Sequence, residues 1–180
     1  ADCFDKSQWV AYLSSTGVYG DHDGAWIDEN AGLLCTDAKS KARVKAEEAF
    51  SAYDAVVLRL GGIYGPGRSL LDAQRRTAST SEKPVNRIHV DDIAGALIAL
   101  ADRDVRATTY NVVDDDPAPR SAVSAFADEL IGPAKAKGAA KPSRGTVSKR
   151  CRNQKLRGVY ELLAPTYKEG LLRIKDADPA

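Results

Sequence analysis

Two short apolar runs, separated by a stretch with the composition of a helix, constrain the fold of this chain more than any other feature. Residues 10–13 and 55–60 each have the length of a buried strand, and the second run is almost continuously apolar, as in a parallel strand covered on both faces. Between them, residues 37–53 contain many good helix formers, and Asp37 is suited to cap their N-terminus. This order predicts a right-handed βαβ unit with two parallel strands.

The first predicted strand ends in three consecutive hydroxyl residues, Ser14, Ser15 and Thr16, followed by Gly17. In an open parallel sheet, ligands bind outside the carboxyl ends of the strands, so hydroxyls at this place would face a binding cleft. Ser, Thr and Gly are also ordinary turn residues, and a plain turn explains the same composition equally well. This stretch alone therefore leaves a cleft and a turn as open alternatives.

The rest of the chain continues with further helices and strands. Asp91 and Ser121 are suited to cap helices at residues 93–101 and 121–130. Other elements are expected at residues 69–76 (helix), 109–113 (strand), 156–163 (helix) and 167–174. Residues 134–150 are basic and low in complexity, which indicates a surface loop. The predicted fold class is α/β.

The composition of the 180 residues is that of a globular protein rather than a membrane or nucleic-acid-binding one. Hydrophobic residues make up 43% and charged residues 28%, the net charge is only +1, and no apolar run is long enough for a membrane span. Three separated cysteines and two histidines do not form a zinc pattern, and they fit reduced thiols in a soluble, intracellular protein. Because the sequence contains no methionine, we expect that its first residue is not the start of translation.

Six short motifs occur in the order in which one protein family carries them. They are residues 12–20 (YLSSTGVYG), 58–67 (LRLGGIYGPG), 89–94 (HVDDIA), 110–114 (YNVVD), 153–156 (NQKL) and 165–167 (PTY). Together they resemble the C-terminal part of an atypical extended short-chain dehydrogenase/reductase of the NAD-dependent epimerase/dehydratase type.

This resemblance implies the C-terminal half of a doubly wound, Rossmann-like parallel sheet with a small α/β substrate lobe. Residues 1–67 would belong to the NAD(P)-binding domain, and residues 68–180 would combine the substrate lobe with elements that return to the sheet. The family's Gly-rich pyrophosphate loop has no counterpart here, because no G-x-G-x-x-G run precedes residue 10. We therefore expect a missing N-terminal segment, or a partner chain, to cover the edge of the sheet.

The family's catalytic motif is altered in this chain. The resemblance places Ser15 at the hydroxyl position that orients the substrate, but the general acid/base motif Tyr-x-x-x-Lys is absent. Lys39 stands at the Tyr position, and Arg43 stands at the Lys position. Because Arg stays protonated, Arg43 is able to hold a ribose but not to shuttle protons. Tyr19 is an alternative catalytic candidate, although an aromatic residue after such a strand also packs the loop.

The resemblance also implies binding roles toward NAD or NADP, without deciding between them, and toward a small substrate similar to a nucleotide sugar. The expected cofactor-binding residues are Ser14, Ser15, Thr16, Arg43, Leu60, Gly61, Gly62 and Ile63, and the expected substrate-binding residues are Arg68 and Arg87. A tight turn would need the same two glycines. His89 fits the capping of a helix better than catalysis.

Two functions remain open from the sequence. The first is an NAD(P)-dependent oxidoreductase or epimerase that acts on a substrate similar to a nucleotide sugar. The second is a catalytically silent protein that binds a dinucleotide as a structural or sensing subunit of a larger assembly. The loss of Tyr-x-x-x-Lys favours the second function, whereas Ser15 and the two glycines favour cofactor binding in both.

Overall fold

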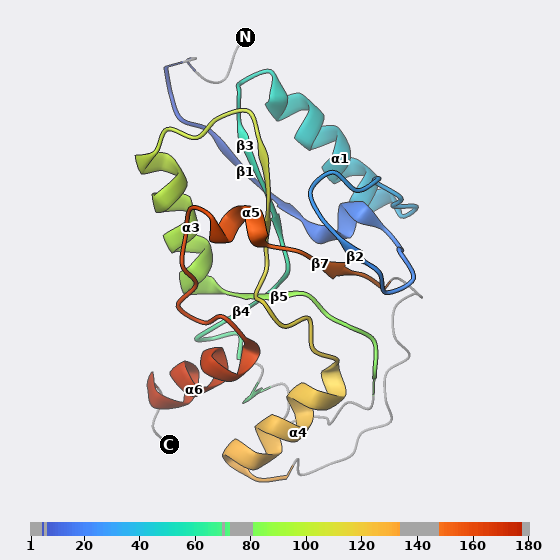
Figure 1. Ribbon diagram of the computed structural model, residues 1–180, viewed down its shortest axis with the longest axis vertical. Coiled ribbons are helices and arrows are strands. Elements are labelled where there is room, and N and C mark those ends of the chain that lie inside the picture. Colours follow the sequence, from blue (N-terminus) through green and yellow to red (C-terminus); the bar gives the residue numbers. More distant parts are fainter. Residues whose placement is uncertain (1–4, 6, 70, 73–80, 134–147, 178–180) are drawn as a thin grey trace.

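A parallel three-stranded sheet forms the upper part of the molecule (Figure 1). The computed structural model describes residues 5, 7–69, 71–72, 81–133 and 148–177. The strands lie in the order β1 (Ala11–Ser15), β3 (Val56–Leu60) and β6 (Thr109–Val112). Helix α1 (Ala38–Ser51) connects β1 to β3, and both strand pairs are parallel. The predicted βαβ unit and the α/β fold class are confirmed.

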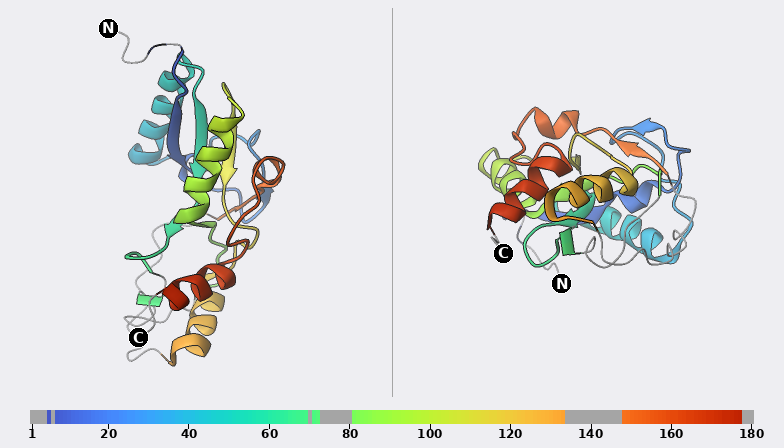
Figure 2. Two further views of the ribbon diagram at one scale, coloured as in Figure 1. Left: turned by 90° about the vertical axis from the view of Figure 1, so that its left-hand side faces the viewer. Right: turned by 90° about the horizontal axis from the view of Figure 1, so that it is seen from below.

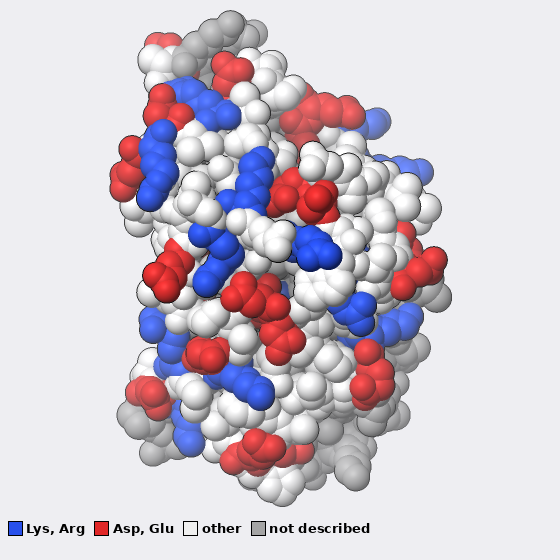
Figure 3. Space-filling model, viewed as in Figure 1, with Lys and Arg blue, Asp and Glu red and all other residues white. Residues whose placement is uncertain are grey.

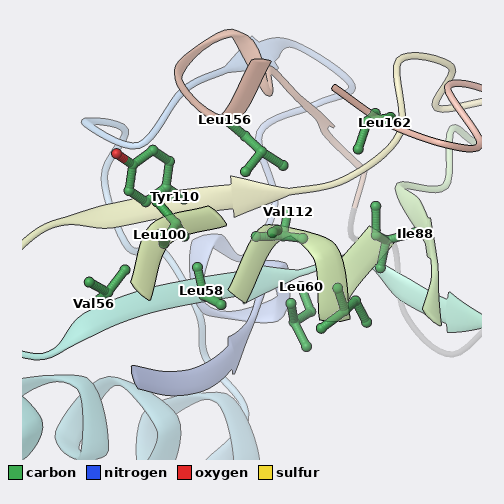
Figure 4. Close-up of a cluster of buried hydrophobic side chains, with 11 residues drawn as sticks. Val56, Leu58, Leu60, Ile88, Leu100, Tyr110, Val112, Leu156 and Leu162 are labelled. Atoms are coloured by element: carbon green, nitrogen blue, oxygen red, sulfur yellow. The ribbon is translucent and has the colours of Figure 1, made fainter. Parts of the chain in front are cut away.

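Helices cover both faces of this sheet. Helix α1 lies on one side and α3 (Val90–Asp102) on the other, as Figures 1 and 2 show from different directions. All of β3 is buried, because it is the middle strand of a sheet that is covered twice. Alternate β3 side chains join a hydrophobic cluster with α3 and β6 (Figure 4), whose buried members are Val56, Leu58, Leu60, Ile88, Ile93, Ala96, Leu100, Tyr110, Val112, Leu156 and Leu162.

A smaller lobe lies below the sheet in Figure 1 and contains a second parallel strand pair. Strand β4 (Gly62–Tyr64) pairs with β5 (Arg87–His89), and helices α4 (Arg120–Ile131) and α6 (Tyr167–Ala177) pack against each other. This part, called the lower lobe below, has its own cluster of buried residues: Tyr64, Leu71, Ala118, Val123, Ala127, Tyr167, Leu171 and Ile174.

A segment near the C-terminus, residues 148–153, crosses the lower end of the sheet and is called the strap below. It contains β7 (Arg150–Cys151), which pairs with β2 (Trp26–Ile27), and it leads into the short helix α5 (Gln154–Arg157). The carboxyl end of β1 continues into a 3₁₀ helix, η1 (Thr16–Tyr19). The strap therefore ties the C-terminal part of the chain to the loops that follow β1.

Three asparagine side chains hold the strap in place, two by binding its backbone and one from within the strap. Asn86 donates to the carbonyl of Lys149 at 3.1 Å and accepts from the amide of Cys151 at 2.8 Å. Asn111 donates to the carbonyl of Arg152 at 3.0 Å. Asn153, at the end of the strap, donates to the carbonyl of Val113 at 2.9 Å. Buried backbone groups that have no sheet partner are paired in this way.

The helix starts differ from the sequence predictions at two of three places. Asp37 caps α1 as predicted, because its carboxylate accepts from the amide of Ser40 at 2.9 Å. Helix α3 is capped by His89 rather than by Asp91, and it begins at Val90. Ser121 does not cap α4, which begins at Arg120 without a side-chain cap. The amide of Ser121 is paired instead with the distant carbonyl of Ser81 at 3.1 Å.

Other differences concern the bounds of the elements. Strand β1 includes Ser14 and Ser15, which were expected to follow the strand, and α5 ends at Arg157 instead of reaching 163. The strands β2, β4, β5 and β7 were not predicted, because two or three residues are too few for a periodic pattern. Of the predicted helix at 69–76, only residues 69, 71 and 72 are described, and residues 134–147 of the predicted loop lie outside the described residues.

The surface carries charges of both signs. On the face in Figure 3, basic and acidic side chains are interspersed over the whole height of the molecule, in keeping with the net charge of +1. Within the described part of the chain, no helix has the length and apolar character needed to cross a bilayer.

Candidate functional site

Ser15 lies at the carboxyl end of β1 with its side chain only partly buried. Its hydroxyl oxygen accepts a hydrogen bond from the amide of Gly17 at 3.1 Å and thereby caps η1. This bond uses a lone pair and leaves the hydroxyl proton available for donation. Ser15 is therefore held in a fixed position at the end of the sheet where ligands bind in open α/β folds.

A second hydroxyl, which the sequence analysis did not single out, lies next to this place. A Cβ atom added to Gly17 would lie 3.3 Å from the hydroxyl oxygens of both Ser15 and Ser40, so both side chains approach the same glycine. Ser40 belongs to the first turn of α1, and its hydroxyl and amide both donate to Asp37, which lowers the pKa of that carboxyl. The capping pattern around Asp37 was visible in the sequence, but the contact with Gly17 depends on how α1 packs.

Ser14 points to the opposite side of β1 from the cluster around α3. Its hydroxyl donates to the Glu47 carboxylate at 2.5 Å, and Glu47 forms a buried ion pair with Arg59 at 2.8 Å. The Ser14 hydroxyl proton is thus committed to an internal network between β1, α1 and β3. This geometry favours a structural role for Ser14 over the predicted contact with a cofactor, and Thr16, which follows Ser15, is also buried.

Tyr19 is completely buried, with 0% of its surface exposed. Its hydroxyl donates to Asn111 Oδ1 at 2.7 Å, and the Arg59 guanidinium lies over its ring, 4.8 Å from the centroid. Burial raises the pKa of the Tyr19 phenol to about 12, although the neighbouring Arg59 opposes this change. A general acid/base works best with a pKa near the operating pH. The geometry therefore favours a packing role for Tyr19.

Lys39 and Arg43, which the sequence analysis placed at the Tyr and Lys positions of the catalytic motif, lie on the same face of α1 as Glu47, since the three are spaced by four residues. Lys39 is exposed and Arg43 is partly buried. Arg43 forms no hydrogen bond or ion pair with the described residues, whereas Glu47 is fully engaged by Ser14 and Arg59. Among the described residues, the Arg43 guanidinium, like the exposed Lys39 ammonium group, is thus free to hold a ligand.

The loop that follows β3 is a tight connection between the sheet and the lower lobe. The amide of Gly61 donates to the carbonyl of Val112 at 3.0 Å, and the amide of Gly62 donates to that of Asn86 at 2.8 Å. A Cβ atom on Gly61 would lie only 3.0 Å from the backbone of Arg87, so the close approach of these two backbone segments requires glycine there. Because both amides are already paired, the turn alternative explains these glycines better than a ligand does.

The neighbours of these glycines, Leu60 and Ile63, also belong to the protein interior. Leu60 is buried in the cluster around α3, and Ile63 packs against that cluster. Their predicted role in cofactor binding would therefore be limited to the backbone or to an edge of the Ile63 side chain.

The two predicted substrate arginines lie in different surroundings. Arg68 is exposed, next to the turn at Gly65. Arg87 is buried and donates to the carbonyls of Val85 at 2.9 Å and Ala118 at 2.6 Å. Burial lowers the pKa of Arg87, although the nearby Asp114 opposes this. Within the described residues, the two arginines do not contact each other and do not share a partner.

Asp114 was not predicted as a site residue. It follows β6 at the lower end of the sheet and is 2% exposed, and neither of its carboxylate oxygens has a hydrogen-bond partner among the described residues. The sequence signal was an acidic run of three residues after a predicted strand. Which of the three carboxylates is buried depends on how the chain turns toward α4. No group of three or more metal-ligating side chains comes together within the described residues.

Comparisons with known proteins agree with this architecture. Neither protein-family models nor curated proteins gave a match. Among solved structures, a conserved protein of unknown function from Silicibacter pomeroyi DSS is 38% identical with a TM-score of 0.84, covering 96% of this chain and 67% of its own. A Methylobacillus flagellatus protein assigned to the NAD-dependent epimerases/dehydratases is 32% identical with a TM-score of 0.78, covering 94% and 64%.

A more distant structure shares the fold alone. The dTDP-glucose 4,6-dehydratase of Bacillus anthracis str. Ames, solved in complex with NAD, is 17% identical with a TM-score of 0.78, covering 93% of this chain and 60% of its own. The chain thus spans about two thirds of the length of the solved relatives that it matches. The parallel sheet, the hydroxyl-bearing end of β1 and these similarities agree, and the chain belongs to the NAD-dependent epimerase/dehydratase family of extended short-chain dehydrogenases/reductases.

Proposed function

We propose that the complete polypeptide containing these residues binds NAD or NADP at the carboxyl end of the sheet and acts on a small substrate similar to a nucleotide sugar. The observation that carries this proposal is the Ser15 hydroxyl, which is fixed by Gly17, partly exposed, and keeps its proton for donation. The relatives named above include a dehydratase of dTDP-glucose solved with NAD, which supports both ligand classes.

The described residues fit one end of such a cofactor. The partly buried Arg43 guanidinium has no partner among the described residues and suits the oxygen atoms of a ribose or a phosphate. The amides of Gly61 and Gly62 are not available to a pyrophosphate, because they are paired with protein carbonyls. We therefore assign only the nicotinamide end to this part of the chain.

The residues of this chain then have limited roles in the chemistry. Bound NAD(P) would supply the hydride acceptor or donor. Ser15 would donate a hydrogen bond to the substrate oxygen next to the reacting carbon and hold it in place. Arg43 would fix the cofactor by its charge, without moving a proton, since its guanidinium stays protonated.

A second candidate function is a protein that binds the dinucleotide without turnover. It is favoured by the absence of Tyr-x-x-x-Lys and by the buried Tyr19, whose pKa of about 12 does not suit proton transfer at neutral pH. In this alternative, Ser15 and Arg43 bind but have no chemistry to assist.

We also propose that a further strand covers the outer edge of β1, supplied by polypeptide outside these 180 residues or by a partner chain. Within the described residues β1 is an edge strand, and its Leu13 side chain is 48% exposed. An open parallel edge with exposed apolar residues favours pairing with another chain.

Titration of the complete polypeptide with NADPH and NADH, followed by cofactor fluorescence, tests binding. We expect a change in fluorescence on binding, and Arg43→Gln should weaken the binding free energy by about 1.5–3 kcal/mol, the range of a hydrogen bond to a charged group. Lys45→Gln, on an exposed position of the same helix, is the matched control. No change at millimolar concentrations of either cofactor would exclude both functions.

Turnover separates the two functions. If the protein is an enzyme, Ser15→Ala should lower kcat about tenfold to a hundredfold while cofactor affinity changes little, because a positioning hydrogen bond is lost. Ser69→Ala, at another partly buried serine, is the control. Cofactor binding without turnover on any nucleotide sugar would identify the silent binder.

A further inference from the structure

Three buried side chains at one junction of the molecule lack hydrogen-bond partners among the described residues. The unpaired atoms are the Tyr64 hydroxyl oxygen, His89 Nε2 and both carboxylate oxygens of Asp114. Tyr64 and His89 face each other across the β4–β5 pair, with ring centroids 5.3 Å apart. The amide of Asp114 donates to the carbonyl of Arg87 on β5 at 2.7 Å. All three residues therefore lie where the sheet meets the lower lobe.

The Asp114 carboxyl group is in a poor position to carry a charge. It forms no ion pair within 4.0 Å in the part of the chain that the structure describes, and its exposed fraction is only 2%. Arg87 is the cation that affects it, but one guanidinium nitrogen of Arg87 is engaged by the carbonyls of Val85 and Ala118. An ionised carboxylate without a partner is far more costly to bury than a neutral carboxylic acid.

The surroundings of Asp114 act in both directions. Arg87 on β5 and the backbone N–H at Asp116 favour the ionised form, whereas burial and the charges of Asp116 and Asp115 favour the protonated form. Burial is the largest of these influences, and the pKa of Asp114 is raised well above its usual range. The charged and titratable groups that act on one another around the junction include Tyr64 on β4, Arg87 and His89 on β5, Asp91 and Asp92 on α3, Arg120 and Glu129 on α4, and Tyr167, Glu169 and Arg173 on α6.

We infer that Asp114 is a protonated carboxylic acid in the folded protein at neutral pH, and that its ionisation loosens the junction between the sheet and the lower lobe. The neutral group costs far less to bury than the charged group, which needs water or a cation. Opening the junction would provide water to Asp114, Tyr64 and His89 together. The packing of the lower lobe against the sheet would therefore depend on pH.

The sign of the effect follows from proton binding. Above about pH 4, near the ordinary value of 3.8, the unfolded chain loses the Asp114 proton while the folded chain keeps it. The folding equilibrium constant therefore falls about tenfold per pH unit until Asp114 ionises in the folded state as well. Acid favours the closed junction, and rising pH weakens it.

Infrared spectroscopy of the complete polypeptide tests the protonation state directly. We expect a carbonyl stretching band of a protonated carboxylic acid at neutral pH that disappears in Asp114→Asn and persists in Asp115→Asn. Asp115 is the matched control, because it is adjacent and exposed. A wild-type spectrum without this band, or a band that Asp114→Asn leaves unchanged, overturns the inference.

Stability measured against pH tests the consequence. Asp114→Asn replaces a neutral acid by a neutral amide of similar shape, so its melting temperature at neutral pH should equal or exceed that of the wild type, with a difference that grows as the pH rises. If Asp114 is instead an ionised partner of Arg87, Asp114→Asn will melt at a lower temperature or fail to fold. Either of these two results contradicts the proposal, and the wild-type infrared titration does not depend on the variant.

Discussion

At the scale of single residues, the surroundings of Tyr19 decide what its phenol contributes. The hydroxyl donates to Asn111, so Tyr19→Phe would leave a buried acceptor unpaired. We expect this change to lower the free energy of unfolding by about 1–3 kcal/mol, measured in urea, and to leave turnover unchanged. Tyr12→Phe, at a partly buried tyrosine that stacks on Phe50, is the control. A large loss of turnover without loss of stability would instead make Tyr19 the catalytic acid/base.

The same phenol predicts a weakness at alkaline pH. Burial raises the pKa of Tyr19 from 10.0 to about 12, so between these values the unfolded chain releases a proton that the folded chain retains. The free energy of unfolding should therefore fall through this range, by up to about 1.4 kcal/mol per pH unit for one such group. Comparing the wild type with Tyr19→Phe over this pH range measures the contribution, and parallel curves would refute it.

Single residues also mark the limit of what the sequence reveals about the site. The position of Ser15 close to the carboxyl end of β1 was predictable, because a hydroxyl that follows an apolar run lies near the end of a strand in a parallel sheet. The partners of Gly61 and Gly62 were not predictable, since their amides are paired with Val112 and Asn86, more than twenty residues further along the chain. The sequence also does not reveal which of the three adjacent aspartates is buried, because the burial of Asp114 depends on tertiary packing.

At the scale of elements, one buried ion pair joins α1 to the sheet. Glu47 on α1 accepts from Ser14 on β1 and pairs with Arg59 on β3. Glu47→Gln would leave the Arg59 charge buried without a counter-ion, so we expect a loss of about 3–5 kcal/mol in the free energy of unfolding.

The exposed Glu48 on the same helix provides the comparison for this change. Glu48→Gln should alter the free energy of unfolding by no more than about 0.5 kcal/mol. Similar effects of the two substitutions in urea unfolding would show that the ion pair does not fix α1.

The elements that the sequence predicted are the long ones. Strands β1, β3 and β6 and helices α1, α3 and α4 were predicted, and an element of no assigned type was expected at residues 167–174, which form α6. Helix α1 was predicted from its helix-forming composition and the Asp37 cap, since only Ser40 and Glu47 of it are buried. These elements have recognisable sequence patterns. The four short strands do not, and the start of α4 was misplaced because the amide of Ser121 is paired with Ser81 rather than with a local cap. Tertiary hydrogen bonds replaced local signals at these positions.

At the scale of the whole molecule, Gly61 sets the distance between the sheet and the lower lobe. An alanine side chain there would lie 3.0 Å from the backbone of Arg87 and push β5 away from β3. We expect Gly61→Ala to cost about 1–3 kcal/mol in the free energy of unfolding. Gly32→Ala is the control, since its added Cβ atom would lie 3.7 Å from the nearest atom, in ordinary contact. Equal stability of the two variants would show that the junction adapts to a larger residue.

The strap has a consequence for how freely this chain is able to vary. Asn86 and Asn111 bind the strap by its main-chain carbonyls and amide, and they make no contact with its side chains in these bonds. Hydrogen bonds of this kind depend on the backbone conformation of the segment and not on the identity of its side chains. Substitutions along the strap therefore leave these bonds intact. Substitution of Asn86 or Asn111 would instead remove the bonds that hold the C-terminal part of the chain to the sheet.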